Sequence, residues 1–381
     1  MRGTPPKPRG DRRIRVLHTV MNMNYGGMER LLADLIRRTD PSRFESHLLV
    51  LQYAGRFAEG LEPHAMVHHA VPLPSWTMLW PRPLADQIAA IAPDVVHSHS
   101  GVWWKSAFAA HLAGVPKIVH TEHGWVRSES RLVALALKKL CARLSTDIVA
   151  VSDDLGAFLA KSVADRPEKV RVVINGVDVD RFCPRRDDGA LRRELGIAPE
   201  APIVLSVGRL ETVKAHDTML RAFARLRSNP GTGTSAVLLL VGDGAEKDRQ
   251  QQLAGELGIA HAVRFAGWRN DVEAAHAAAA LFTLTSTSEG TSIALLEAMS
   301  AGICPVVTDV GGNAAVLGPD LAHRLVPSGD VDAIARAWRD GLADAARRRG
   351  DAEAARARVV ARFSIAATVR QYEEIYAAVR S

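Results

Sequence analysis

Glu289 and Glu297 are two carboxylates separated by seven residues, in a stretch that also offers groups able to bind an anion. The apolar run 280–284 before them predicts a buried strand, and Gly302 after them predicts the end of a helix. We therefore expect Glu289 in the loop that joins strand to helix, and Glu297 about a turn and a half inside the helix.

Thr291 and Ser292 lie where that helix would begin. Their hydroxyls are suited to capping it, and the first N–H groups of a helix are free to bind an anion. Two carboxylates beside an anion-binding helix start suit a ligand that carries both hydroxyl groups and phosphate. A nucleotide sugar is such a ligand.

Arg209 and Lys214 follow a second apolar strand, 203–207, so both cations can project from its carboxyl end. When a sugar leaves a nucleoside diphosphate, negative charge develops on the leaving oxygens. A fork-shaped guanidinium and a compact ammonium would stabilise that charge. A surface ion pair is the alternative interpretation.

Gly26 and Gly27 break the chain between the first expected strand, 15–20, and the first expected helix, 28–37. Glycine permits positive φ and lets a ligand approach the backbone closely. Phosphates could then bind the amides at the helix start. A tight turn without a ligand explains the same pair equally well.

Two histidine clusters end two further strands, His97 with His99 and His120 with His123. Neither cluster has a third ligand at a metal-binding spacing, and no Asp-x-Asp pair lies beside them, so we expect no metal. His123, followed by Gly124, is interpreted as a polar wall of a cleft that hydrogen-bonds a sugar hydroxyl or a leaving-group oxygen. A purely structural histidine is the alternative.

Strand-like and helix-like segments alternate along the whole chain, which is typical of parallel α/β architecture. The first series of apolar strands is expected at 15–20, 47–51, 94–97, 117–120, 147–151 and 170–174, and the second at 203–207, 236–241, 263–266, 280–284 and 304–308. We predict two doubly wound domains, residues 14–178 and 179–361, followed by a helix at 362–381. Ligands of such folds bind at the carboxyl ends of the strands.

The composition is that of a globular chain: 381 residues, 47% hydrophobic, with three scattered cysteines that fit a reducing cytoplasm. The net charge of +6 permits anionic partners, but 5% aromatic residues without a recognition motif argue against nucleic acid. Residues 1–13 read as a disordered basic tail, and no apolar run is long enough to span a membrane. This tail and the Trp76–Trp80 segment suggest peripheral contact with an anionic membrane. An acceptor wall or ordinary core packing explains the Trp segment equally well.

Taken together, the motifs resemble the retaining glycosyltransferases of the large family-four group, whose GT-B fold has two Rossmann-like domains facing across a cleft. Glu289 and Glu297 match the E-x7-E motif of that family. The other matching motifs are the Gly26-Gly27 loop, 93–97, 121–124, 151–152, 175–178, 208–210 with Lys214, and Gly311-Gly312. The resemblance covers residues 14–376 and is closest to bacterial exopolysaccharide sugar transferases.

The resemblance implies a role for each matching residue. His123, Arg209, Lys214 and Glu289 would be catalytic, beside the transferred sugar or its diphosphate. The donor would be bound by Gly26, Gly27, Gly290, Thr291, Ser292, Ile293 and Glu297, with Glu297 on the ribose, and the strand end from Arg264 to Trp268 would cradle the base. The first domain would bind the acceptor, a glycan, lipid-linked or small molecule, and the last helix would cross back onto it. No metal or other cofactor is implied.

Two positions depart from the family pattern: Ala215 stands where glycine is usual, and Ala315 where glutamate is usual. The second departure puts fine positioning of the donor in doubt. Two other functions fit the residues, a nucleotide-sugar epimerase and a catalytically silent nucleotide-sugar-binding partner. The residues favour neither UDP, GDP nor ADP as the donor nucleotide.

Overall fold

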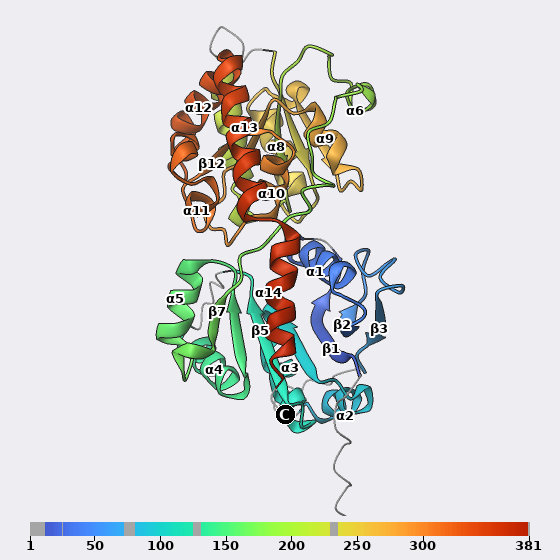
Figure 1. The fold of residues 1–381 in the computed structure, drawn as a ribbon. Helices are drawn as coiled ribbons and strands as arrows, with labels where there is room; N and C mark the ends of the chain where they lie inside the picture. Colours follow the sequence, from blue (N-terminus) through green and yellow to red (C-terminus); the bar gives the residue numbers. More distant parts are fainter. Residues whose placement is uncertain (1–11, 25, 72–80, 125–130, 229–234, 380–381) are drawn as a thin grey trace, which may run out of the picture.

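The computed structural model describes residues 12–24, 26–71, 81–124, 131–228 and 235–379. Most of the predicted basic tail and the Trp76–Trp80 segment lie outside the described residues. Two domains stack one above the other, and a single helix near the end of the chain spans from the second to the first (Figure 1). Among the described residues, no helix is both long and apolar enough to cross a membrane.

The first domain is built on a seven-stranded sheet of order β3-β2-β1-β4-β5-β6-β7, and all its pairings are parallel. Its strands are β1 (Ile14–Asn22), β2 (Phe44–Tyr53), β3 (Ala65–His69), β4 (Val95–His99), β5 (Lys117–Glu122), β6 (Asp147–Ala150) and β7 (Val170–Val172). Its helices are α1 (Gly27–Arg38), α2 (Arg82–Ile91), α3 (Trp103–Leu112), α4 (Arg131–Leu144) and α5 (Asp153–Ser162).

The second domain repeats this design with a six-stranded parallel sheet of order β10-β9-β8-β11-β12-β13. Its strands are β8 (Ile203–Val207), β9 (Val237–Val241), β10 (Val263–Gly267), β11 (Leu281–Leu284), β12 (Cys304–Thr308) and β13 (Leu325–Val326). Its helices are α6 (Ala190–Glu194), α7 (His216–Arg227), α8 (Lys247–Glu256), α9 (Val272–Ala278), α10 (Ile293–Ser300), α11 (Asn313–Leu317), α12 (Val331–Ala343) and α13 (Ala345–Arg362).

Both sheets are covered on two faces, which explains the nearly unbroken apolar sequence of their central strands. β9, for example, is Val-Leu-Leu-Leu-Val and is buried throughout. In each sheet the first strand of the domain, β1 or β8, lies in the interior. The next strands follow on one side of it and the later strands on the other, so the direction of the strand order reverses at this first strand. This reversal is the point at which doubly wound sheets bind ligands, beyond the carboxyl ends of the strands.

The last helix, α14 (Ile365–Ala377), packs against β1 and α1 of the first domain, although it follows the second domain in sequence (Figure 1). Its tyrosines are fully buried there: Tyr376 hydrogen-bonds His97 at 2.7 Å, and Tyr372 lies 3.2 Å from the hydroxyl of Thr121. Val177 lies where the chain leaves the first domain, and Ser364 lies where it returns to it. The two residues form an isolated parallel β-bridge. The first domain therefore contains the end of the chain as part of its own core.

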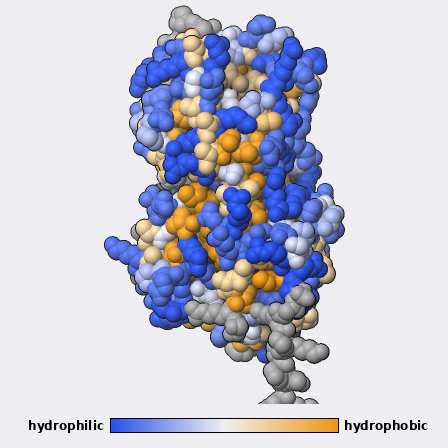
Figure 2. All heavy atoms as spheres, viewed as in Figure 1, coloured by the Kyte–Doolittle hydropathy of each residue, from blue (hydrophilic) through white to orange (hydrophobic). Residues whose placement is uncertain are grey.

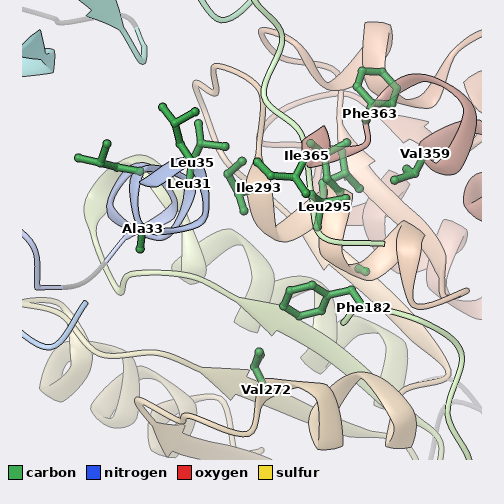
Figure 3. Close-up of a cluster of buried hydrophobic side chains, with 14 of the residues drawn as sticks. Leu31, Ala33, Leu35, Phe182, Val272, Ile293, Leu295, Val359, Phe363 and Ile365 are labelled. Carbon is green, nitrogen blue, oxygen red and sulfur yellow. The ribbon is translucent and has the colours of Figure 1, made fainter. Parts of the chain in front are cut away.

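One hydrophobic cluster joins the two domains. It runs from α1 residues such as Leu31 and Leu35 to Ile293 on α10 and Phe363 before α14, as Figure 3 shows. In the face shown in Figure 2, hydrophobic residues gather around the level where the domains meet, and hydrophilic residues cover much of the remainder. Burial of this shared apolar surface stabilises the relative placement of the domains.

Candidate active site

A cavity of about 490 Å³ lies between the two domains. Its walls come from the loops and helix starts that follow β1, β4 and β5 of the first domain and β8, β9, β10 and β11 of the second. Eleven of the twelve residues that the sequence assigned to the site line it: Gly26, Gly27, His123, Arg209, Lys214, Glu289, Gly290, Thr291, Ser292, Ile293 and Glu297. The twelfth, Arg264, lies elsewhere.

Lys214 and Glu289 form an ion pair within the cavity wall. The Lys214 ammonium donates to Oε1 of Glu289 at 2.7 Å, and the hydroxyl of Ser286 donates to the same oxygen at 2.6 Å. The Glu289 side chain is only 8% exposed, so this carboxylate is fixed by a charge and a hydroxyl rather than by water. Both contacts are made by Oε1, and the second oxygen can accept from a ligand hydroxyl.

Arg209 lies beside this pair but is more accessible, with 55% of its side chain exposed and its guanidinium 2.8 Å from Glu211. Glu29, in the first turn of α1, also lines the cavity, and burial raises the pKa of its carboxyl while the charge of Arg209 lowers it. The start of α1, where free N–H groups could bind an anion, therefore also carries an acidic side chain. Arg209 can move toward an anion at little cost because its present ion pair is largely solvated.

The start of α10 is capped, as expected, by Ser292, whose hydroxyl accepts from the Leu295 N–H at 3.4 Å. Thr291 is not a cap: its hydroxyl donates to the Val151 carbonyl at 2.6 Å, across the interface between the domains. Asn175 donates to the Thr291 carbonyl at 3.3 Å from the first domain's side. Thr291 thus joins the domains, and Ser292 alone performs the role predicted for both.

Glu297 is buried on α10, and the Arg30 guanidinium of α1 approaches it from the other domain at 3.4 Å. The geometry is that of an ion pair without a hydrogen bond, because Oε1 of Glu297 and Nη1 of Arg30 have no hydrogen-bond partner among the described residues. Burial raises the pKa of Glu297 to about 7, although the charges of Arg30 and Arg181 lower it. An oxygen that lacks a donor and faces a cavity is suited to bind ligand hydroxyls.

His123 directly follows β5, and another histidine lies behind its ring. Its Nε2 lies 3.2 Å from Nδ1 of His99, whereas its Nδ1 has no partner among the described residues. Burial lowers the pKa of His123 to about 4, so it is neutral at physiological pH. His123 lines the cavity, and Nδ1 is the ring nitrogen that remains for a ligand to bond.

His18, His97 and His99 each have one nitrogen within 4.8 Å of the others, a grouping that could in principle hold a metal ion. However, both ring nitrogens of His97 are already hydrogen-bonded, to Tyr376 and Thr121, each at 2.7 Å. A metal ion there would have to displace one of these buried partners. The sequence analysis did not connect His18 with the other histidines, because β1 is remote from β4 in sequence and adjacent to it only in the sheet.

Glycines let the loops approach one another. A side chain on Gly290 would place its Cβ 2.7 Å from the His123 carbonyl of the opposite domain, so only glycine fits there. Gly26 has φ 149°, a conformation that other residues rarely adopt, and it directly precedes α1. These two positions keep the walls of the cavity close together.

Arg264 does not contribute to the cavity, contrary to the prediction. Its guanidinium donates to the carbonyls of Leu195 at 2.7 Å, His261 at 2.8 Å and Gly196 at 3.2 Å, so it fastens loops of the second domain. Arg264 lies near the start of β10, and it is the carboxyl end of this strand that reaches the cavity, through Trp268 and Arg269. The guanidinium of Arg56, from the first domain, lies over the Trp268 ring, 4.8 Å from the ring centroid.

Arg30 and Asn175 are site residues that the sequence analysis did not single out. Arg30 follows the Gly26-Gly27 loop by one helical turn and could have been found from that spacing, because residues three and four apart share a helix face. Asn175 entered the sequence analysis only as part of the 175–178 motif. Its contact with Thr291 depends on how the two domains meet, which no local pattern reveals.

Comparison with known protein families divides the chain in the same manner as the structure. Residues 25–181 match the model described as "Glycosyltransferase Family 4", and residues 187–358 match "Glycosyl transferases group 1". A D-inositol 3-phosphate glycosyltransferase of Streptomyces scabiei is 30% identical over 361 residues, which cover 85% of this chain and 80% of that protein.

A second relative is the UDP-Gal:alpha-D-GlcNAc-diphosphoundecaprenol alpha-1,3-galactosyltransferase of Escherichia coli. It is 30% identical over 254 residues, or 64% of this chain, and the match spans just under two thirds, 65%, of that enzyme. Among solved structures, Anabaena HepE in complex with UDP and glucose superposes with a TM-score of 0.81 at 23% identity, covering 96% of this chain and all of that one. This likeness shows the GT-B fold, and with the family matches it establishes that the chain belongs to the group 1, family 4 glycosyltransferases.

Proposed function

We propose that the protein is a retaining glycosyltransferase that moves a sugar from a nucleotide-diphosphate sugar to an acceptor. The observation that carries this proposal is the convergence of the Lys214–Glu289 pair, Arg209, the start of α10, Glu297 and His123 on one interdomain cavity. Cations, helix amides and carboxylates suit the diphosphate and the hydroxyl groups of one such ligand.

Each part of the donor has a corresponding part of the cavity. The diphosphate binds Arg209, Lys214 and the amides at the start of α10, helped by the Gly26-Gly27 loop. The ribose hydroxyls donate to the Glu297 oxygen that lacks a partner, and the base lies near Trp268. Glu289 and His123 hold the hydroxyls of the transferred sugar. UDP is the first nucleotide to test, since the Escherichia coli relative is named for UDP-Gal and HepE was solved with UDP.

In the proposed mechanism, the acceptor hydroxyl attacks the anomeric carbon on the face from which the diphosphate departs. The C–O bond to the phosphate breaks, the leaving phosphate oxygen takes the acceptor proton, and the new bond keeps the anomeric configuration. Arg209 and Lys214 stabilise the charge that develops on the diphosphate, which is usually the largest single catalytic contribution. No metal ion is needed, because these two side chains supply the positive charge.

For the acceptor, we propose a glycan or lipid-linked saccharide of exopolysaccharide or cell-envelope synthesis. The name of the Escherichia coli relative, which specifies a diphosphoundecaprenol-linked sugar, supports this choice. A small-molecule acceptor such as the inositol phosphate of the Streptomyces scabiei relative is the second candidate. The two acceptors make different demands, because only a lipid-linked one requires contact with a membrane.

Helix α4 supports peripheral membrane contact. Its outer face exposes Val133, Leu137 and Leu140, with 71%, 38% and 41% exposure, and Lys139 and Arg143 are exposed on the same helix. Apolar side chains beside basic ones suit an anionic bilayer surface. Flotation with acidic vesicles at low salt should recover the protein, and a Leu137→Glu/Leu140→Glu variant should lose binding, whereas Met66→Glu on the edge strand should not. Equal recovery of all three proteins would contradict this contact.

The central experiment combines binding with product analysis. The full-length protein is screened by thermal shift against UDP, GDP and ADP and their common sugars, where a ligand at 100 times its Kd should stabilise by about 2.7 kcal/mol. The stabilising donor is then incubated with lipid-linked saccharides and inositol phosphate, and the anomeric configuration of any product is read by NMR. A product with inverted anomeric configuration would contradict the retaining mechanism but not the transferase activity.

The same assay separates the two alternatives. An epimerase would interconvert the sugar of the donor without an acceptor. A silent binding partner would be stabilised by a nucleotide sugar but would neither transfer nor hydrolyse it. The ion-paired Glu289 and the cavity-facing His123 favour a catalyst over a silent partner, since binding the nucleotide alone would not require them.

A further inference from the structure

Three histidines form a continuous chain from the interior of the first domain to the cavity. Nδ1 of His18 lies 3.4 Å from Nε2 of His99, and Nδ1 of His99 lies 3.2 Å from Nε2 of His123. His18 is on β1, His99 ends β4, and His123 follows β5, so the chain crosses three adjacent strands. Of the three, only His123 lines the cavity.

All three rings are neutral at physiological pH. Burial lowers the pKa of His18 to about 3 and of His123 to about 4, and it lowers the pKa of His99, which also faces neighbouring histidines, well below its usual value. A neutral imidazole carries one N–H and one acceptor nitrogen. Each ring must therefore donate on one side and accept on the other.

This requirement couples the three tautomers. If His99 carries its proton on Nδ1, it donates to His123, which must then carry its own proton on Nδ1, and it accepts from Nδ1–H of His18. If His99 carries its proton on Nε2, every ring is reversed, and His123 presents an acceptor nitrogen to the cavity. No mixed arrangement makes both hydrogen bonds.

The two arrangements differ in what they leave at the buried end. Nε2 of His18 is buried and has no hydrogen-bond partner among the described residues. The first arrangement leaves a lone pair there, and the reversed one leaves an N–H without an acceptor; among buried backbone groups, an orphaned N–H is the rarer of these two defects. At the cavity end a ligand hydroxyl can satisfy either form, since it both donates and accepts.

His97 keeps the middle ring in place. Its own nitrogens are fixed by Tyr376 of α14 and by Thr121, and its ring centroid lies 4.0 Å from that of His99. The His99 ring is fully buried against it and cannot turn without disturbing this packing. The geometry of the chain is therefore held from both the sheet and the crossing helix.

We propose that His18 and His99 are positioning residues that fix His123 as the Nδ1–H tautomer, so that His123 presents a hydrogen-bond donor to the cavity. In the proposed transferase, this N–H donates to a hydroxyl or leaving-group oxygen of the sugar donor. That last step rests on the proposed function, whereas the tautomer itself does not.

The test is ¹⁵N NMR of the histidine rings in the full-length protein at pH 7, where long-range ¹H–¹⁵N couplings identify the protonated nitrogen of each ring. We expect Nδ1–H for His18, His99 and His123 in the wild type. Finding Nε2–H or an averaged signal for His123 overturns the proposal, whether or not any variant folds. Because this readout needs no substrate, it stands even if the protein proves not to transfer sugar.

Variants of His18 separate positioning from general packing. His18→Leu removes the donor to His99, so the His123 ring should change to a mixture of tautomers and kcat should fall roughly 10-fold with little change in donor KM. His18→Asn retains an amide donor near the position of Nδ1 and should restore both the tautomer and kcat. An unchanged His123 tautomer in His18→Leu overturns the proposal.

His120→Leu is the matched control. His120 is equally buried on β5, but its Nδ1 bonds Ser98 at 2.9 Å and its ring stacks on Trp103 at 4.0 Å, outside the chain. Its loss should leave the His123 tautomer unchanged. A tautomer change as large as that in His18→Leu would show that any buried histidine has this effect and would overturn the proposal.

Discussion

Nε of Arg30 lies 3.4 Å from Oε1 of Glu297, and this pair joins the first helix of one domain to the helix that forms the donor side of the other. The carboxylate assigned to the ribose thus has its charge balanced from across the cavity. Because burial opposes its ionisation, the charge state of Glu297 depends on the two domains staying together.

Donor affinity should consequently depend on pH. The pKa of Glu297 is raised from 4.5 to about 7, so the carboxylate is protonated as the pH falls through 7 and loses strength as an acceptor for the ribose hydroxyls. Binding of a nucleotide sugar should weaken below pH 7, which calorimetry would show as a larger Kd. The phosphates of such a ligand do not titrate in this range. In Glu297→Gln this dependence should disappear.

Arg30→Gln should move the midpoint of that pH dependence upward, because the charge of Arg30 lowers the pKa of Glu297. Arg37→Gln, on the same helix, serves as the control and should keep the midpoint of the wild type. A downward shift in Arg30→Gln would show that the pair does not govern the titration.

Lys214→Ala should lower kcat by roughly 100-fold or more, the usual effect of removing one donor that stabilises developing negative charge. Steady-state kinetics with a saturating donor measure this fall. The rates are corrected for the folded fraction, because the variant leaves Glu289 without its ion-pair partner and can lose stability. Lys161→Ala, an exposed lysine on α5, should retain wild-type turnover. Turnover of Lys214→Ala within a few-fold of wild type would remove Lys214 from the mechanism.

Trp268→Ala should weaken nucleotide binding by roughly 10-fold, in the range of base–aromatic stacking. Arg264→Ala should leave Kd unchanged and lower the melting temperature instead, because the guanidinium donates to backbone carbonyls of its own domain. Calorimetry and thermal unfolding of the two variants measure both effects. Weaker nucleotide binding by Arg264→Ala would show that Arg264 does belong to the binding site.

Ala215→Gly should stabilise the protein by about 1 kcal/mol. Ala215 has φ 49° and ψ 47°, the left-handed conformation in which a Cβ is unfavourable, at the position directly before α7. Denaturant unfolding should show the gain, and Ala224→Gly, inside the same helix, should instead destabilise. A loss of stability in Ala215→Gly would mean that the packing of its methyl group outweighs the backbone strain.

Chelation with EDTA should leave turnover unchanged, and added Mg²⁺ should not increase it, because Arg209 and Lys214 supply the positive charge for the diphosphate. Dialysed protein assayed with and without each reagent tests this directly. Loss of activity with EDTA and its recovery with a divalent ion would assign part of that role to a metal.

Much of the fold could be predicted from the sequence, because buried parallel strands are nearly continuous apolar runs and the Gly26-Gly27 break separates strand from helix. The strands that were missed lie at the sheet edges. β3, Ala-Met-Val-His-His, alternates only weakly and exposes Met66, and β13 has two residues. Edge strands lack the burial that makes central strands recognisable.

The site could be predicted where a residue lies beyond the carboxyl end of a strand and before the next helix, as Lys214, His123 and Glu289 do. It could not be predicted where the outcome depends on which partner is nearest in space. Arg264 lies near the start of β10 and bonds a loop of its own domain, whereas Trp268 directly follows the end of that strand and reaches the cavity. The histidine chain depends on strand order, which places β1 beside β4.

The burial of Tyr372 and Tyr376 beneath the first sheet has a consequence for synthesis on the ribosome. The strands of residues 14–172 emerge early, but the core they enclose is completed only by residues 365–377, which are made after the second domain. Until then His97 lacks its tyrosine partner, and the surface that Tyr372 and Tyr376 cover stays uncovered. The first domain therefore gains its final stability only after the second has been made, so nascent chains should need protection from aggregation for longer than the order of the domains suggests.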